Sequence, residues 1–184
     1  MIIRNAKPVD AEAAAVLILS AIKDIAEALT GETAELEILR VLRDYFKREK
    51  NRLSYRNSII LETKGEIAGI VIAYHGSEAE QLDAPIRSRL KQKMQNAVVD
   101  KEAEVTDYYL DTLCVAHQHR GKRMGTMLIA AAEEKGRRLG YATIALNVEK
   151  DNERARSLYS RLGYKFRKVI LINHHNYDYM VKNL

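Results

Sequence analysis

The chain has 184 residues, of which 47% are hydrophobic and 30% are charged. This composition is typical of a globular protein that builds its own core, and it excludes an intrinsically disordered chain. The longest apolar run, Ala13 to Leu19, is far shorter than the roughly 20 residues that a membrane-spanning helix needs. We therefore expect one soluble domain over residues 1–184, since no repeat, linker or low-complexity tract divides the chain.

The net charge is +5, from 30 basic and 25 acidic residues. An excess of positive charge favours anionic partners, but interspersed charges of both signs mostly form a solvated surface. We expect no nucleic-acid partner, because the basic residues form no recognisable nucleic-acid motif. Cys114 is the single cysteine, so an intrachain disulfide is impossible. With no recognisable signal peptide, we expect a cytoplasmic protein.

The first third of the chain predicts one strand and two helices. Residues 2–6 read as a short strand that ends before Pro8. Asp10 is suited to cap the next helix, since its carboxylate can accept from the free amides of the first turn. That helix should run to about Leu29 and stop near Gly31. A second helix is expected over about residues 33–48, where apolar side chains recur at helical spacing.

The middle of the chain predicts a β-hairpin followed by an insertion. Residues 58–62 and 67–74 are rich in Ile and Val and flank the turn pair Lys64-Gly65. Residues 76–104 are polar and hold one expected helix, from about residue 85 to residue 96. The insertion should separate two strands of the same sheet.

Strands and helices alternate in the last third. We expect strands at residues 108–115, 142–148, 165–172 and 177–181, a helix from Met124 that ends at Gly140, and another around Ala155 to Leu162 that ends before Gly163. Alternating strands and helices predict parallel pairing with right-handed crossovers. The hairpins at either end predict antiparallel pairing. The fold class is therefore α/β with a mixed sheet.

The segment from Ala116 to Thr126, between an expected strand and an expected helix, has the properties of an anion site. A helix N-terminus presents backbone amides without intrahelical partners and carries partial positive charge. Glycine lets a ligand approach the backbone closely. Three basic residues, Arg120, Lys122 and Arg123, add charge around the same point. A diphosphate would fit here. The segment lacks the Gly-Lys-Ser/Thr of a P-loop and the third glycine of a dinucleotide motif. A basic, solvated helix start is the alternative.

Two stretches resemble the signatures of the GNAT superfamily of N-acetyltransferases. Residues 113–115 followed by 120–126 resemble its acetyl-CoA-binding motif, Gln/Arg-x-x-Gly-x-Gly/Ala, with Arg120 in the first position and Gly125 in the last. Asn152 to Tyr164 matches its second signature, Asn-x-x-Ala-x-x-Leu-Tyr-x-x-x-Gly-Phe/Tyr. The specific match covers residues 110–166, and the front half agrees only in its order of elements.

The resemblance implies the acyl-CoA N-acyltransferase fold, in which helices flank a twisted, mostly antiparallel mixed sheet of about seven strands. It implies acetyl-CoA as the cosubstrate, no metal, an amine on a small molecule or peptide as the acceptor, and by family habit a homodimer. The coenzyme-binding residues that it implies are Leu113, Cys114, Val115, Arg120, Gly121, Lys122, Arg123, Met124, Gly125, Thr126, Asn147, Asn152 and Tyr159. Main-chain groups of Leu113 and Val115 would pair with the pantetheine arm.

Arg123 departs from the family pattern, which has glycine at this position. A side chain is compatible with the site if residue 123 is already helical and points outward. Arg123 would then either reach a phosphate or weaken coenzyme binding.

The resemblance makes Tyr159 the group that protonates the departing coenzyme sulfur, which a phenol with a pKa near 10 can do. The periodicity alone would fit a core aromatic. Asp111 is our candidate general base, because it interrupts an apolar strand where an unpaired buried carboxylate would be costly. A salt-bridged or exposed Asp111, with water as the base, is an equal alternative. Asn147 suits positioning rather than proton transfer, and Asn152 suits capping, pantetheine contact or both.

The leading interpretation is an enzyme that transfers an acetyl group from acetyl-CoA to an amine, by direct attack in a ternary complex. A catalytically weak acetyl-CoA-binding module of the same fold is the second interpretation, and Arg123 is the residue that motivates it. Cys114 suits a buried core thiol better than a nucleophile, since no activating histidine lies next to it in the sequence. The helices of residues 10–50 and the insertion of residues 76–104 are expected to shape the acceptor pocket.

Overall fold

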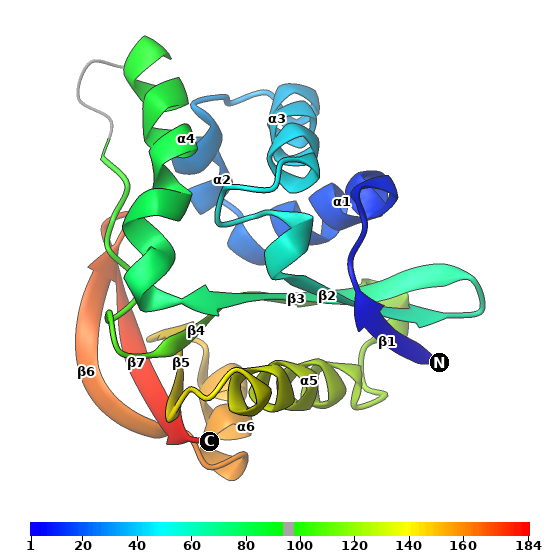
Figure 1. Ribbon diagram of the computed structural model, residues 1–184, viewed down its shortest axis with the longest axis vertical. Helices are drawn as coiled ribbons and strands as arrows, with labels where there is room; N and C mark the ends of the chain where they lie inside the picture. The colour runs from blue at the N-terminus through cyan, green and yellow to red at the C-terminus, as the bar shows by residue number, and fades with distance from the viewer. Residues whose placement is uncertain (94–97) are drawn as a thin grey trace.

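The computed structural model describes residues 1–93 and 98–184. A twisted seven-stranded sheet in the order β1-β2-β3-β4-β5-β7-β6 lies between two layers of helices (Figure 1). The strands are β1 (Ile2–Asn5), β2 (Ser58–Thr63), β3 (Glu66–His75), β4 (Tyr108–Val115), β5 (Thr143–Glu149), β6 (Lys165–Ile172) and β7 (His175–Asn183). The helices are α1 (Ala11–Ile22), α2 (Ile25–Thr30), α3 (Glu35–Lys47), α4 (Ala79–Lys93), α5 (Met124–Arg138) and α6 (Glu153–Arg161).

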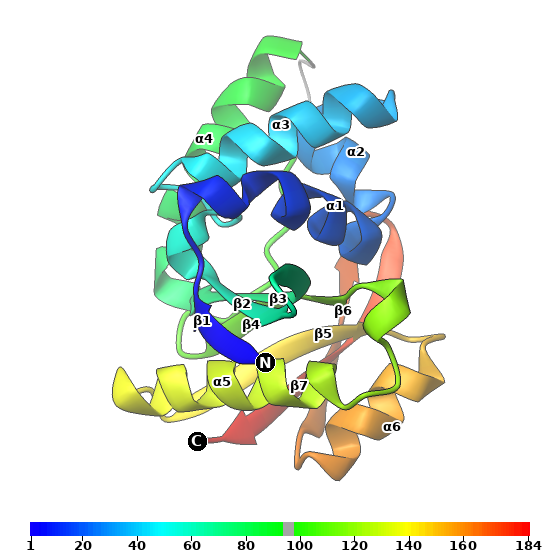
Figure 2. The ribbon, with the colours of Figure 1, turned by 90° about the vertical axis from the view of Figure 1, so that its right-hand side faces the viewer.

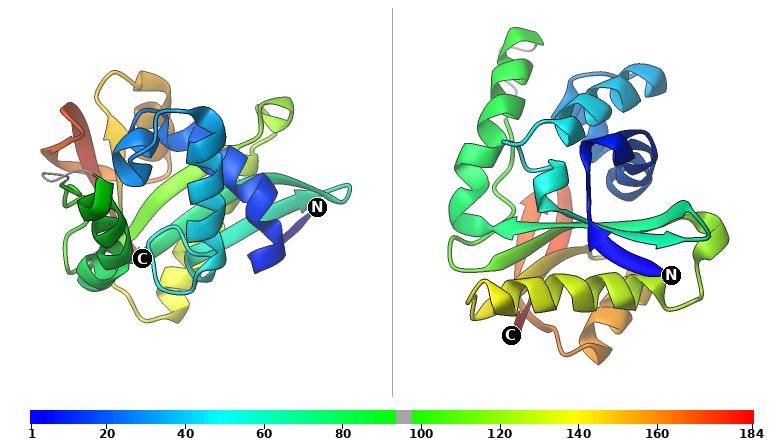
Figure 3. Two further views of the ribbon diagram at one scale, coloured as in Figure 1. Left: turned by 90° about the horizontal axis from the view of Figure 1, so that it is seen from above. Right: turned by 45° about the vertical axis from the view of Figure 1, so that its right-hand side comes forward.

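The mixed sheet is confirmed. β4 and β5 pair in parallel, and all the other neighbouring strands pair antiparallel. Helices α1 to α4 cover one face, and α5 and α6 cover the other (Figures 2 and 3). None of the helices within residues 1–93 and 98–184 has the length and apolar content to cross a membrane.

Each face of the sheet buries its own core. On one side, α3 buries Ile38, Leu42 and Phe46 against α1 and the sheet, as its helical spacing predicts. On the other side, α5 buries Leu128 and Ala132 together with apolar residues of the sheet. The sheet therefore separates two hydrophobic cores, one on each face.

The helix expected from Asp10 to Leu29 is in fact two helices. α1 ends at Ile22, Lys23 takes a positive φ of 46°, and α2 then runs from Ile25 to Thr30. The break lets α2 pack against α3 and α4, and it buries Ala26 and Leu29 in the core of that layer. The expected stop at Gly31 is confirmed, with a left-handed φ of 68°.

The capping prediction for Asp10 is wrong. Its carboxylate accepts from the amide of Lys7 at 2.7 Å and pairs with Arg4 at 2.8 Å, so it does not cap α1. A short 3₁₀ turn over residues 8–10 precedes the helix, and this turn points the carboxylate back towards β1.

The helix of the insertion starts earlier than expected. α4 begins at Ala79 and contains Pro85 inside it, so proline does not mark its start. The predicted end, near residue 96, falls on residues 94–97, which lie outside the described part of the chain.

The end of the insertion packs tightly against the end of β3, at Gly76. The Gly76 amide donates to the Asp107 carbonyl at 2.9 Å. A Cβ atom on Gly76 would lie 1.8 Å from the Glu104 backbone oxygen, so residue 76 has no room for a side chain. Gly76 therefore fixes how the segment of residues 98–107 returns to the sheet.

We predict that Gly76→Ala lowers the free energy of unfolding by about 2 kcal/mol or more, because the backbone of residues 104–105 must move to accept the methyl group. Urea denaturation measures this loss. Glu78→Ala, in the same 3₁₀ turn, is the control and should change stability little. A Gly76→Ala protein as stable as the wild type would contradict this packing.

Candidate functional site

β4 and β5 separate part of the way along their length. They pair only at Tyr108, Tyr109 and Leu110 of β4, although β4 continues to Val115. A β-bulge coincides with the point of separation. On β3, Ile72 pairs with Thr112 and the next residue pairs with Leu110, so Asp111 is the extra residue. A bulge bends its strand and ends regular pairing, which accounts for the opening between β4 and β5.

The register shows which backbone groups face this opening. The Ala116 amide donates to the Ala68 carbonyl at 2.9 Å, on the β3 side of the strand. In an antiparallel pair these bonds occur at every second residue, so the amides and carbonyls of Leu113 and Val115 point the other way, towards the β5 side. The Val115 carbonyl accepts there from Arg120 Nε at 3.3 Å. This arrangement suits a ligand that pairs like a strand.

The predicted anion loop lies at the open end. After a 3₁₀ turn, Gly121 adopts a φ of 78°, and α5 begins at Met124. The first intrahelical bond runs from the Met127 amide to the Arg123 carbonyl at 3.1 Å, so the amides of residues 124–126 precede it. Residues 120–123 are exposed. The amides of residues 124–126 at the N-terminus of α5 therefore lie close to three exposed basic residues, Arg120, Lys122 and Arg123.

A helical backbone at residue 123, the condition under which a side chain would suit the site, is not met. Arg123 precedes α5 and has a left-handed backbone with a φ of 59° and a ψ of 14°. The chain must reverse here to enter the helix, and only glycine does so without steric cost. The conformation accounts for the glycine of the family motif, and it shows that Arg123 carries backbone strain.

Tyr159 lies on α6, whose first turn is capped as predicted. The Asn152 side chain accepts from the Ala155 amide at 3.1 Å. Tyr159 is 9% exposed and belongs to the core that includes side chains of Leu113 and Val115. Burial raises the pKa of Tyr159 to about 12, so its hydroxyl keeps its proton at neutral pH.

Cys114 points to the opposite core and is 6% exposed. Burial raises the pKa of its thiol, which favours the unreactive protonated form. Among residues 1–93 and 98–184, no group of three or more His, Cys, Asp or Glu side chains is arranged to hold a metal ion.

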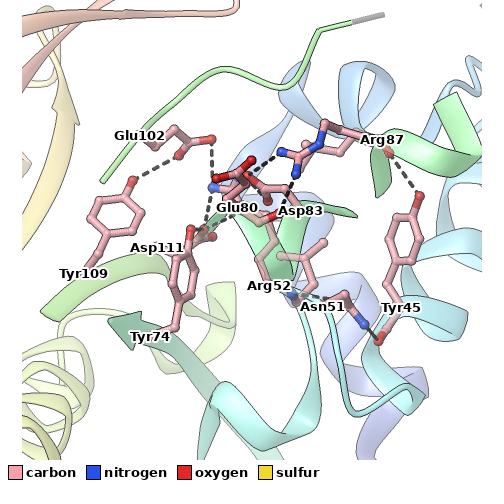
Figure 4. Close-up of polar contacts among 12 residues, drawn as sticks. Tyr45, Asn51, Arg52, Tyr74, Glu80, Asp83, Arg87, Glu102, Tyr109 and Asp111 are labelled. Atoms are coloured by element: carbon pink, nitrogen blue, oxygen red, sulfur yellow. Dashed lines mark hydrogen bonds and ion pairs between the residues drawn. The ribbon is translucent and has the colours of Figure 1, made fainter. Parts of the chain in front are cut away.

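On the α1–α4 side of the opening, Asp111 is held in a buried ion pair. Its Oδ2 accepts from Arg52 Nε at 2.8 Å and Nη2 at 2.5 Å, and from the Tyr74 hydroxyl at 3.0 Å. Its Oδ1 accepts from Thr112 at 2.8 Å. Asp111 is therefore salt-bridged and not exposed (Figure 4).

Two more carboxylates surround the same arginine. Arg52 Nη2 lies 2.7 Å from Glu102 Oε1, and Nη1 lies 3.7 Å from Asp83 Oδ1. Burial by itself would lower the pKa of Arg52, but the charges of Asp111 and Glu102 outweigh it and leave that pKa well above its usual value. Arg52 is therefore a permanent buried cation.

Arg52 lies in the loop between α3 and β2, and hydrogen bonds of its neighbour Asn51 hold this loop in place. Asn51 is buried, donates to the Tyr45 carbonyl at 2.6 Å, and accepts from the Leu53 amide at 2.9 Å. These bonds hold the backbone between α3 and β2, and they therefore set the position from which the Arg52 side chain extends.

Asn147 of β5 joins the other side of this network. Its Nδ2 donates to the Tyr109 hydroxyl at 2.8 Å and to the Glu102 carbonyl at 3.1 Å. The Tyr109 hydroxyl donates to Glu102 Oε2 at 3.0 Å. Asn147 therefore lies on the α1–α4 face, away from the face that holds Tyr159.

The structure divides the predicted residues between two faces of one opening. Leu113, Val115 and Tyr159 share the α5–α6 side, and Asp111 and Asn147 share the other. The sequence did not reveal Arg52, Glu102 or Asp83. A carboxylate within an apolar strand does predict a buried cation as its partner, but no spacing rule identifies a residue 59 positions away.

Comparisons with known proteins agree with this geometry. The family model described as Acetyltransferase (GNAT) family matches residues 19–164. A solved acetyltransferase structure is 29% identical over 100% of this chain and 99% of its own, with a TM-score of 0.84. An N-acetyltransferase from Staphylococcus aureus Mu50 is 23% identical over 99% and 100%, with a TM-score of 0.87.

A more distant structure has the same fold. The Drosophila melanogaster polyamine N-acetyltransferase, an enzyme that forms N-acetylagmatine, is 15% identical over 100% of this chain and 99% of its own, with a TM-score of 0.61. No curated protein matches the sequence.

We predict that Arg123→Gly is more stable than Arg123→Ala by about 1 kcal/mol, because glycine alone adopts the left-handed backbone at residue 123 without strain. The two variants lack the same charge, so their difference isolates the backbone term. Chemical denaturation of both proteins measures it. Equal stabilities would mean that residue 123 is unstrained.

Proposed function

Because the chain belongs to the acetyltransferase (GNAT) family, we propose that it is an N-acetyltransferase that moves the acetyl group of acetyl-CoA to a primary amine in a ternary complex. The observation that carries this proposal is the opening between β4 and β5. It exposes the main-chain groups of Leu113 and Val115 and ends at the N-terminus of α5.

The coenzyme would lie in this opening. The diphosphate would accept hydrogen bonds from the amides of residues 124–126, with Arg120 and Lys122 close by. The amides and carbonyls of Leu113 and Val115 would pair with the pantetheine arm as a neighbouring strand does. The thioester would then lie near the bulge, where β4 and β5 come together.

The reaction needs a neutral amine, a stabilised oxyanion and a protonated leaving group. The amine nitrogen attacks the thioester carbonyl, and a main-chain amide of β4 stabilises the oxygen of the tetrahedral intermediate. As the carbon–sulfur bond breaks, Tyr159 gives its proton to the sulfur. The amine proton passes to water, and Tyr159 then recovers a proton from solvent. At neutral pH the Tyr159 hydroxyl carries the proton that this step transfers.

We assign Asp111 an electrostatic role on the acceptor side. Its two oxygens already accept from Arg52, Tyr74 and Thr112. Oδ2 already accepts three hydrogen bonds, so direct proton abstraction would have to use Oδ1, which accepts from Thr112. Asn147 would help to position the acceptor, and Asn152 would cap α6 beside the coenzyme.

Two measurements on the same protein test the proposal. We predict that isothermal titration calorimetry detects acetyl-CoA binding that weakens as salt rises, because the loop binds an anion through exposed cations. We also predict thiol release when acetyl-CoA is supplied with a panel of primary amines. Binding without thiol release on a broad panel would favour the coenzyme-binding module. Absence of binding at millimolar acetyl-CoA would refute both functions.

We predict that Tyr159→Phe lowers kcat by roughly ten- to a thousand-fold with little change in coenzyme affinity, since only the transferred proton is lost. Tyr164→Phe is the matched control. Its ring lies 5.8 Å from that of Tyr159, and its hydroxyl donates to Glu133 in the core. It should reduce stability more than turnover. An unchanged kcat in Tyr159→Phe would exclude the acid role.

A further inference from the structure

A cavity of about 370 Å³ lies beside the buried arginine. It is bounded by the end of β3, the first half of α4 and the segment that returns from the insertion to the sheet. Its lining includes Arg52, Tyr74, Asp83, Arg87, Glu102 and Val105. The cavity is not part of the coenzyme opening, and no step of the proposed transfer reaction uses it.

The cavity shares side chains with the proposed reaction centre. Arg52 and Tyr74 line it, and both donate hydrogen bonds to Asp111 at the bulge. Glu102 lines it too, and its backbone carbonyl accepts from Asn147 on β5. These shared residues place the cavity next to the point where β4 and β5 separate.

The buried charges around the cavity do not balance. Arg52, 2% exposed, faces three carboxylates: Asp83, Glu102 and Asp111, whose side chains are 9%, 10% and 4% exposed. The rest of the lining adds two cations, Arg87 and Lys101, and two acids, Glu80 and Asp100, so the site keeps an excess of negative charge. Burial, and after it the charge of Asp111, raise the pKa of both Asp83 and Glu102 above their usual values. A further cation in the cavity would stabilise the ionised carboxylates.

Asp83 has unused hydrogen-bonding capacity. Its Oδ1 is fully buried and makes no hydrogen bond to any of the described residues. The Arg52 Nη1 atom lies 3.7 Å from it, beyond hydrogen-bond distance, and Arg87 lies 4.0 Å from the other oxygen. A purely structural ion cluster would be expected to satisfy such an atom, because an unpaired buried acceptor is costly.

We propose that this cavity binds a second cationic group of the acceptor, which makes the acceptor a linear aliphatic diamine or polyamine, with Asp83 as the anchor of its distal ammonium. The inference rests on the proposed function, since the proximal amine is the one that is acetylated. Asp83 supplies the free acceptor oxygen, and Glu102 and Asp111 supply the negative field that favours a dication over a monocation.

The first experiment uses the wild-type protein. Thiol release is measured with putrescine, with butylamine, which has one amine, and with aminobutanol, which replaces the second amine by a neutral hydroxyl. A charge-assisted hydrogen bond to the distal ammonium should raise kcat/KM for putrescine over both by about ten- to a hundred-fold. Longer diamines and spermidine then measure the span from reaction centre to anchor.

Two variants with opposite expected effects test whether the preference for putrescine over butylamine arises at Asp83. Asp83→Asn keeps the shape of the side chain and should lower the putrescine-to-butylamine ratio about ten-fold or more. Arg87→Gln removes the cation that competes for Asp83, so it should raise the ratio. Asp44→Asn, which removes an exposed acid on α3, is the matched control and should leave the ratio unchanged.

The outcomes separate this inference from the proposed function. Transfer to monoamines without a preference for putrescine, or a preference that neither Asp83→Asn nor Arg87→Gln alters, overturns the diamine site and leaves the acetyltransferase intact. If no amine supports thiol release, the proposed function fails instead. In that case, calorimetry measures putrescine binding to the wild type and to Asp83→Asn without any need for turnover. Equal binding to both proteins, or no binding to either, overturns the diamine site.

Discussion

The β-bulge at Asp111 is the constraint on which the rest of the site depends. Leu110 and Leu113 both face the α5–α6 core although three positions separate them, so the bulge shifts the alternation of β4 by one residue. This shift puts Asp111 and Thr112 together on the other face. It also ends pairing with β5, so that the next main-chain groups of β4 have no strand beside them. One extra residue thus creates both the coenzyme opening and the acidic face across from it.

An unpaired, buried Asp111 carboxylate at the bulge would destabilise the fold. The ion pair with Arg52 removes most of this cost. A buried ion pair adds little net stability, because desolvation of both partners offsets their attraction. Arg52 therefore serves better as a means of holding several carboxylates in one place than as a stabilising element. Its own position depends on Asn51, which ties the loop between α3 and β2 to the end of α3. The position of this buried cation is therefore set by backbone contacts outside the charge cluster.

Local signals in the sequence predicted most of the fold. The glycines that end α5 and α6, Gly140 and Gly163, have φ values of 80° and 92°, as C-terminal caps require. Long-range packing decided what was missed. The break at Lys23 follows from the need of α2 to reach α3 and α4, and the bonds of Asp10 follow from Arg4. For the site, the sequence identified the strand, loop and helix that form the opening, because their residues are close in sequence. The cluster of Arg52 with Asp83, Glu102 and Asp111 joins four separate segments of the chain. The periodicity of the sequence cannot predict contacts between such distant segments.

The two faces of the opening have opposite electrostatic designs, and this difference bears on selectivity. At the α5 end, the loop concentrates positive charge on exposed side chains beside amides that precede the first intrahelical bond, which suits a highly charged diphosphate that arrives from water. At the acceptor end, the excess charge is negative and buried, where salt screens it least. This arrangement would draw the proposed cationic acceptor and the proposed anionic coenzyme to opposite sides of the same bulge. An acceptor bound as proposed would meet an electrostatic cost if it carried a carboxylate next to these buried acids, so the proposed site would disfavour zwitterionic amines such as amino acids.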